Sequence, residues 1–222
     1  GRAYAESRRR RSKLTTDGKL VIHASDHPAR MVTGMLGDPL GMGNHLDYLG
    51  RILRVATTVD IDGFMSTPDF IEDLMIVDML NMEAGGTSFL DNRLLVGCMN
   101  RGGVAGSRFE MDDRITAYTP AGMVKMGLDG AKLMFRIDLA DEGSLKTLEY
   151  CAKAIDRCCD LGLPVFPEHL PIAHGDCLHT LHRTPPANIT PDGAAAARGY
   201  PTPHTRLRVP VLGDFRWVLL AP

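Results

Sequence analysis

Residues 130–138 read GAKLMFRID and alternate as a β-strand does when its two faces meet different surroundings. Side chains alternate across a strand, so Leu133 and Phe135 share one face and are expected to pack against helices. Lys132 and Arg136 share the opposite face. A cation buried there requires an acidic partner or must lose its charge. The segment therefore predicts a strand with an apolar outer face and a charged inner face.

Short apolar runs alternate with longer stretches of helical period, which is typical of repeated βα units around a parallel sheet. The strands are expected at residues 20–25, 62–66, 93–99, 130–137, 164–168 and 205–211. The helices are expected at residues 45–55, 68–83, 120–126 and 144–161. The strand starts are spaced by about 30 to 40 residues, which is close to the length of one strand plus its return helix.

Parallel strands joined by helices predict either a doubly wound sheet or an α/β barrel of the (β/α)8 TIM type. No GxGxxG motif follows the first strand, which weakens the doubly wound, nucleotide-binding alternative. A complete barrel typically needs about 250 residues. We therefore expect an incomplete TIM barrel with about six of the eight strands, five of them in residues 1–171. Residues 172–222 are rich in proline and histidine and are expected to form a divergent tail with a possible sixth strand.

Composition and charge exclude several classes of protein. The sequence is 44% hydrophobic and 23% charged with a formal net charge of -2, which is ordinary for a globular protein and gives no overall field for nucleic acid or anionic membrane. The arginine run at residues 8–11 is interpreted as a solvated helix end. We find no apolar stretch of membrane-spanning length and no secretory signal in the chain as given. The odd count of 5 cysteines without CxxC spacing favours reduced thiols, so we expect a cytoplasmic protein.

Functional residues of parallel α/β sheets gather at the carboxyl ends of the strands. Asp26 follows the first strand and Glu168 ends the fifth, so both are candidate partners for Lys132. A lysine held among carboxylates suits carbonyl chemistry, because amine attack and proton transfer need a lysine tuned by its neighbours. The alternative is a charged network that only fills the interior. We predict that these three residues are catalytic.

Other polar residues at the same ends are predicted to position substrate oxygens, by charge and location alone. They are Asn100 and Arg101, in the loop after the third strand, and Arg136 on the fourth. We expect a phosphorylated small molecule as the substrate, and a homo-oligomer is possible because missing strands would leave an exposed sheet edge.

Three segments carry a family resemblance: ASDHPAR at 24–30, MNRGGVAGSRFEMDDR at 99–114 and GAKLMFRID at 130–138. They resemble bacterial (β/α)8 proteins labelled deoxyribose-phosphate aldolase and found with inositol-catabolism genes. Together with LPVFPE at 163–168 they also resemble, more distantly, class I aldolases of the tagatose-bisphosphate aldolase type. The resemblance implies a lyase that cleaves or forms a carbon-carbon bond through a lysine Schiff base, in a phosphorylated sugar or keto-acid substrate. No metal or organic cofactor is implied, since the imine itself serves as the electron sink.

The resemblance also implies individual roles. Asp26 would be the carboxylate of strand one, Lys132 the assisting lysine of strand four, and Glu168 the acid or base of strand five. The Schiff-base lysine of such enzymes lies on strand six, where the matching segment TRLRVPVLGDF at 205–215 has Arg208 instead. A guanidinium stays protonated and has no free lone pair for an imine. Either Lys132 itself forms the imine, or the chain is a defective or partial copy of an active enzyme.

Two other functions remain open. A metal-dependent hydrolase could use nitrogen and oxygen ligands. Its candidate ligands are His23, Asp26, His27, Glu168 and His169. A non-catalytic truncated barrel could instead bind a sugar phosphate or a partner subunit through Arg101 and Arg108.

Overall fold

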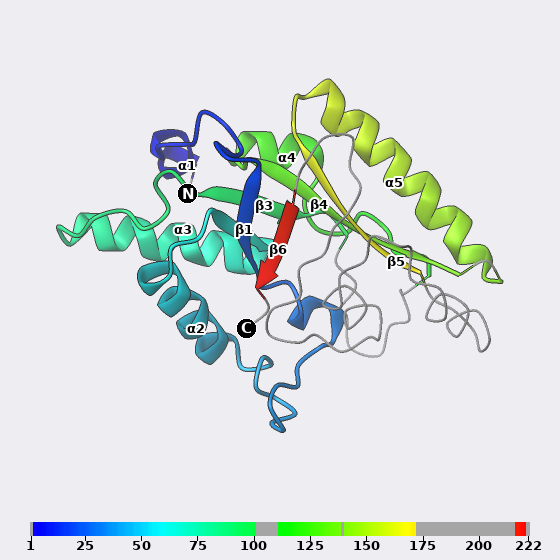
Figure 1. Ribbon diagram of the computed structural model, residues 1–222, viewed down its shortest axis with the longest axis horizontal. Coiled ribbons are helices and arrows are strands. Elements are labelled where there is room, and N and C mark those ends of the chain that lie inside the picture. Colours follow the sequence, from blue (N-terminus) through cyan, green and yellow to red (C-terminus); the bar gives the residue numbers. More distant parts are fainter. Residues whose placement is uncertain (1, 101–110, 139, 172–215, 221–222) are drawn as a thin grey trace.

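The computed structural model describes residues 2–100, 111–138, 140–171 and 216–220, whose strands form one parallel sheet (Figure 1). The strands are β1 (Lys19–Ala24), β2 (Gly63–Ser66), β3 (Leu94–Cys98), β4 (Gly130–Ile137), β5 (Val165–Pro171) and β6 (Arg216–Leu220). The helices are α1 (Arg2–Ser7), the short 3-10 helix η1 (Pro28–Arg30), α2 (His45–Thr58), α3 (Pro68–Glu83), α4 (Pro120–Lys125) and α5 (Glu142–Asp160). The sheet order is β5-β4-β3-β2-β1-β6, and every pairing is parallel.

The expectation of a (β/α)8 TIM barrel is wrong. The described strands form an open sheet that has β5 at one edge and β6 at the other. The expected sixth strand at 205–211 lies outside the described residues, and β6 instead pairs with β1, in the register that places Lys19 opposite Arg216. The prediction of parallel strands alternating with helices, and thus of the α/β class, is correct.

Local sequence explains why the helices begin where they do. Asn44 and Thr119 cap α2 and α4 by accepting from backbone N–H groups, and Asp141 does the same for α5. Pro68 occupies the first turn of α3, where a missing N–H costs nothing. None of the helices in the described residues is both long and apolar enough to cross a membrane.

Alternation along the strands divides the apolar core into two layers. The outer layer holds strand residues such as Phe64 and Leu133 together with side chains from α2, α3, α4 and α5. The inner layer consists mainly of strand residues, among them Ile22, Val96 and Phe166. The α-helices of the described chain therefore pack on one face of the sheet. The other face carries a layer of apolar side chains, and Lys132 lies on that face.

The arginine run at residues 8–11 directly follows α1 and is solvated only in part: Arg9 is exposed, whereas Arg8 is buried. The Arg8 side chain is 0% exposed and lies 2.7 Å from Asp129, which also accepts from Arg10. Arg11 lies 2.6 Å from Asp62. Both aspartates directly precede strands, so these arginines hold the amino ends of β2 and β4, opposite to the ends where function is expected.

Candidate functional site

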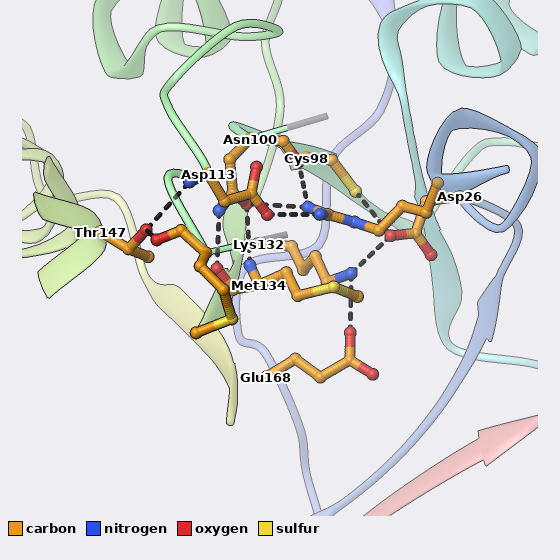
Figure 2. A network of polar contacts seen from close by, with 10 residues as sticks. Asp26, Cys98, Asn100, Asp113, Lys132, Met134, Thr147 and Glu168 are labelled. Atoms are coloured by element: carbon orange, nitrogen blue, oxygen red, sulfur yellow. Dashed lines mark hydrogen bonds and ion pairs between the residues drawn. The ribbon is translucent and has the colours of Figure 1, made fainter. Parts of the chain in front are cut away.

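Lys132 occupies the inner face of β4, between Cys98 of β3 and Phe166 of β5 in the strand register. Its side chain is 1% exposed, although it carries an ammonium group. The Nζ atom donates to Asp26 Oδ2 and lies 2.7 Å from Glu168 Oε2 (Figure 2). The structure therefore brings together all three side chains that the sequence predicted as catalytic. Their catalytic role stays a prediction.

The two carboxylates come from opposite sides of Lys132. Asp26 lies two residues beyond the end of β1 and is 6% exposed. Glu168 lies on β5, opposite Met134, and its side chain is 35% exposed. A substrate approaching from solvent would thus meet Glu168 before it met Asp26.

Burial and charge act in opposite directions on the ammonium group. Burial alone lowers the pKa of Lys132, because a charge is costly in an apolar interior, but Asp26 and Glu168 raise that pKa, and the net pKa lies above the ordinary value. Burial similarly raises the pKa of Asp26, but the adjacent Lys132 lowers it more, to about 2. The resting pair is therefore ammonium and carboxylate across the physiological range.

Cys98 is a further site residue that sequence reasoning missed. Its buried thiol donates to Asp26 Oδ2 at 3.5 Å, and burial, followed by the charge of Asp26, holds the pKa of the thiol well above the ordinary value. The group is thus a neutral thiol, inert as a nucleophile. The signal was present in the sequence, because Cys98 falls on the inward face of the strand next to Lys132.

Asn100 lies near Lys132, but its amide is already engaged. The side-chain Nδ2 donates to the carbonyl oxygen of Met134 at 2.6 Å, and Oδ1 accepts from the Met134 amide at 2.8 Å. The side chain thereby extends the pairing between β3 and β4, and this structural bond competes with the predicted role of contacting substrate. Arg136 lies on the inner face of β4 and is half-buried, whereas Arg101 and Arg108 lie outside the described residues.

A buried guanidinium completes the network, and the sequence predicted its place at the end of the first strand but no role for it. Arg30, the last residue of η1, forms an ion pair with Asp113 in which both side chains are almost fully buried. The same guanidinium donates to the backbone oxygen of Asn100 and to its Oδ1 at 3.2 Å. Its position four residues after Asp26 was the available signal, because it places both groups at the carboxyl end of β1.

The metal-site alternative finds no support in the described geometry. His23 projects from the opposite face of β1 and meets the ring of Phe64 edge-on at 6.0 Å. Burial, with a smaller contribution from His27, lowers the pKa of His23 to about 4. Within the described residues, no group of three or more His, Cys, Asp or Glu side chains could hold a metal ion.

Comparison with known proteins gives one family and one solved neighbour to report. The model of the family described as Cgl0159-like matches residues 18–222. The crystal structure of Cgl0159 from Corynebacterium glutamicum (Brevibacterium flavum) is 37% identical in sequence, with a TM-score of 0.67. That match covers 78% of this chain and 56% of the other, so this chain spans little more than half the length of that protein. No curated protein matches the chain.

Proposed function

We propose that this chain, which belongs to the Cgl0159-like family, is a lyase of the class I aldolase type. It would cleave or form a carbon-carbon bond in a phosphorylated sugar or keto-acid substrate. One observation carries the proposal: Lys132 Nζ is buried and in contact with the carboxylates of Asp26 and Glu168 at once. The segments that resemble class I aldolases favour this reaction, because the resemblance gives roles in it to Asp26, Lys132 and Glu168, the three residues that meet here.

Lys132 is the lysine with the surroundings that imine chemistry requires. The other lysines of the sequence are Lys13, Lys19, Lys125, Lys146 and Lys153. All five are exposed, in contrast to Lys132, and Lys19 also lies at the amino end of β1. Arg208 stands at the sequence position where the aldolases that this chain resembles have the imine lysine, but a guanidinium cannot form an imine. The proposal therefore assigns the imine to Lys132.

The two carboxylates provide the proton transfers that this reaction needs. The ammonium of Lys132 passes a proton to Glu168, and the amine then attacks the substrate carbonyl carbon to form a carbinolamine. Glu168 returns the proton to the departing hydroxyl, so water leaves and a protonated imine remains. Neutralising Glu168 also removes one influence that raises the pKa of Lys132, so that Asp26 is the carboxylate that still opposes the effect of burial.

Bond cleavage follows from the protonated imine. Asp26 accepts the proton of the hydroxyl group on the β carbon, and the bond between the α and β carbons breaks as the carbonyl group forms at the β carbon. The released electron pair moves into the imine to give an enamine, and the fragment that carried the hydroxyl group leaves as an aldehyde. Protonation of the enamine carbon and addition of water then release the second product and restore Lys132.

Borohydride trapping tests the proposal directly. The protein is incubated with dihydroxyacetone phosphate or with pyruvate, reduced with borohydride, digested and analysed by mass spectrometry. We expect a reduced adduct on Lys132. The variant Lys132→Arg keeps the charge between the carboxylates but lacks the amine, so it should form no adduct. The matched control Lys153→Arg, altered at a lysine whose side chain is 72% exposed, should be labelled like the wild type. Equal labelling of the Lys132→Arg variant, or no adduct with either carbonyl compound, would overturn the proposal.

A further inference from the structure

We infer that Arg30 is a positioning residue for this lyase, which ties the loop that carries Asp26 to the strand that carries Lys132. The inference rests on the proposed function and adds a residue that acts through others. It stands on a continuous path of buried contacts from Arg30 to both members of the ion pair.

The first part of the path anchors the guanidinium. Arg30 Nη1 pairs with Asp113, and the two side chains are 5% and 1% exposed. The backbone N–H of Asp113 in turn donates to Thr147 Oγ1 at 2.9 Å, which fixes Asp113 against α5. A cation buried this deeply is retained only where its partners are in place, so Arg30 has one well-defined position.

The second part of the path leads to Lys132. Arg30 Nη2 donates to the backbone oxygen and to Oδ1 of Asn100, and the Asn100 amide is bonded to both the N–H and the C=O of Met134. Met134 lies two residues after Lys132 on the same inner face of β4. Figure 2 shows Asn100 and Asp113 on one side of Lys132, and Asp26 and Glu168 near its Nζ. Arg30 thereby sets the carboxyl end of β4.

The third part of the path leads to Asp26. Arg30 belongs to η1, which begins two residues after Asp26 and is closed by a bond from the Arg30 N–H to the His27 oxygen at 2.9 Å. Anchoring the side chain of Arg30 fixes this tight turn and with it the Asp26 carboxylate. Lysine cannot replace the guanidinium here, because one ammonium does not reproduce a planar fork with donors to two different partners.

The charge of Arg30 acts in the same sense as its geometry. It lowers the pKa of Asp26 and also that of Lys132. A positive charge at this place therefore favours the carboxylate that accepts a proton and the amine that attacks a carbonyl.

Kinetics of three variants test the inference. They are Arg30→Lys, Arg30→Gln, and the double variant Arg30→Gln with Asp113→Asn, which avoids leaving a buried carboxylate unpaired. With rates divided by the fraction of Lys132 that borohydride traps, we expect kcat to fall by roughly 10- to 100-fold in all three, while KM changes by less than about threefold. The control Arg114→Gln, altered in an exposed pair with Asp112, should keep both constants.

A second measurement does not depend on activity. Amide hydrogen exchange at Met134, whose N–H is bonded to Asn100 Oδ1, should become at least about tenfold faster in the double variant. Exchange at Leu95, bonded to Asp129 at 2.9 Å on the other end of the sheet, should not change.

The possible outcomes separate the two proposals. If the wild type neither traps a carbonyl compound nor cleaves one, the proposed function fails, and exchange at Met134 alone decides whether Arg30 orders the site. If the wild type is active but the variants keep its kcat per trappable lysine, Arg30 has no positioning role. Full activity of Arg30→Lys would likewise overturn the inference, because charge alone would then suffice.

Discussion

Cys98 and Lys132 lie directly opposite each other on β3 and β4, and both donate to the same oxygen of Asp26. A charged donor and a weak neutral donor thus meet at one oxygen atom of a buried side chain. Charge-assisted bonds are the stronger kind, so Lys132 dominates the stabilisation of the Asp26 carboxylate. Loss of the lysine would therefore alter Asp26 far more than loss of the thiol.

We predict that Asp26→Asn weakens the fold at neutral pH and removes part of its acid sensitivity. Asp26 has a pKa of about 2 in the fold, below the value of about 3.9 for an unfolded chain. The stabilisation is thus fully present above pH about 4 and is lost as the pH falls toward 2; it amounts to ~2 kcal/mol. Urea unfolding at several pH values measures it. The prediction is contradicted if the unfolding free energy of the variant falls as much as that of the wild type between pH about 4 and about 2.

We predict that His23 causes a second loss of stability on acidification, at higher pH than that of Asp26. Its pKa falls from about 6.5 to about 4 on burial, so the unfolded chain takes up a proton that the fold excludes. The neutral histidine contributes stability above pH about 6.5, and this contribution, ~3 kcal/mol, is lost as the pH falls to 4. His23→Gln should flatten the unfolding free energy between these two values. It should leave the lower window of Asp26 intact.

The N-terminal arginines offer a matched pair of stability variants. Arg8→Ala removes a fully buried guanidinium that bonds Asp129 and the carbonyl oxygens of Arg93 and Gly127, so we expect a loss of about 3–5 kcal/mol. Arg9→Ala breaks a 3.4 Å pair whose arginine is 70% exposed, and we expect less than about 1 kcal/mol. Thermal and denaturant unfolding of the two variants provide the comparison. Equal losses would show that Arg8 does not hold the strand ends.

Two glycines should respond to alanine in opposite ways. A Cβ atom added at Gly63 would lie 2.4 Å from the backbone oxygen of Leu94 on the neighbouring strand, so Gly63→Ala must displace β2 or β3. Gly50 lies within α2 with nothing within 4 Å of an added Cβ, and Gly50→Ala should stabilise the fold by about 0.5–1 kcal/mol. Calorimetry should therefore give a lower Tm for the first variant and a higher Tm for the second.

We expect Arg136→Ala to act on substrate binding. The residue lies on the inner face of β4, two positions beyond Met134, and is half-buried. Removing its charge should raise KM for a phosphorylated substrate by about tenfold and leave kcat within about threefold, as for a group that binds ground and transition states equally. Steady-state kinetics measure both constants. A loss confined to kcat would assign Arg136 to the chemical step instead.

The sequence predicted individual elements better than their assembly. The alternation in residues 130–137 predicted β4 with its observed bounds, and the apolar period that starts at Pro68 predicted α3 with its bounds. The bounds of such elements follow from residues that are close together in the sequence. The pairing of β6 with β1 joins distant parts of the chain, and no local pattern specifies it, so the expected barrel was wrong. The range of helix α1 was not predicted, only a helix end at the arginine run, because α1 is only 6 residues long and is held by tertiary contacts such as Tyr4 with Asp78.

The candidate site divides in the same way. Lys132, Asp26 and Glu168 were predicted together because parallel strands bring their carboxyl ends to one edge. The roles of Arg30 and Asn100 could not be predicted in this way, because each depends on a partner loop whose path is set by packing. Arg8 was misinterpreted for the same reason, since its burial follows from where Asp129 lies and not from the arginine run itself.

The arginine segment has a consequence for how a protein of this kind can diverge. Its ion pairs hold the amino ends of β2 and β4, at the opposite end of the sheet from Lys132. Loops at the reactive end can then accept changes in length and composition over evolutionary time, since the architecture does not depend on them. Changes in those loops can then alter which substrates bind, while the arginine ion pairs continue to stabilise the sheet.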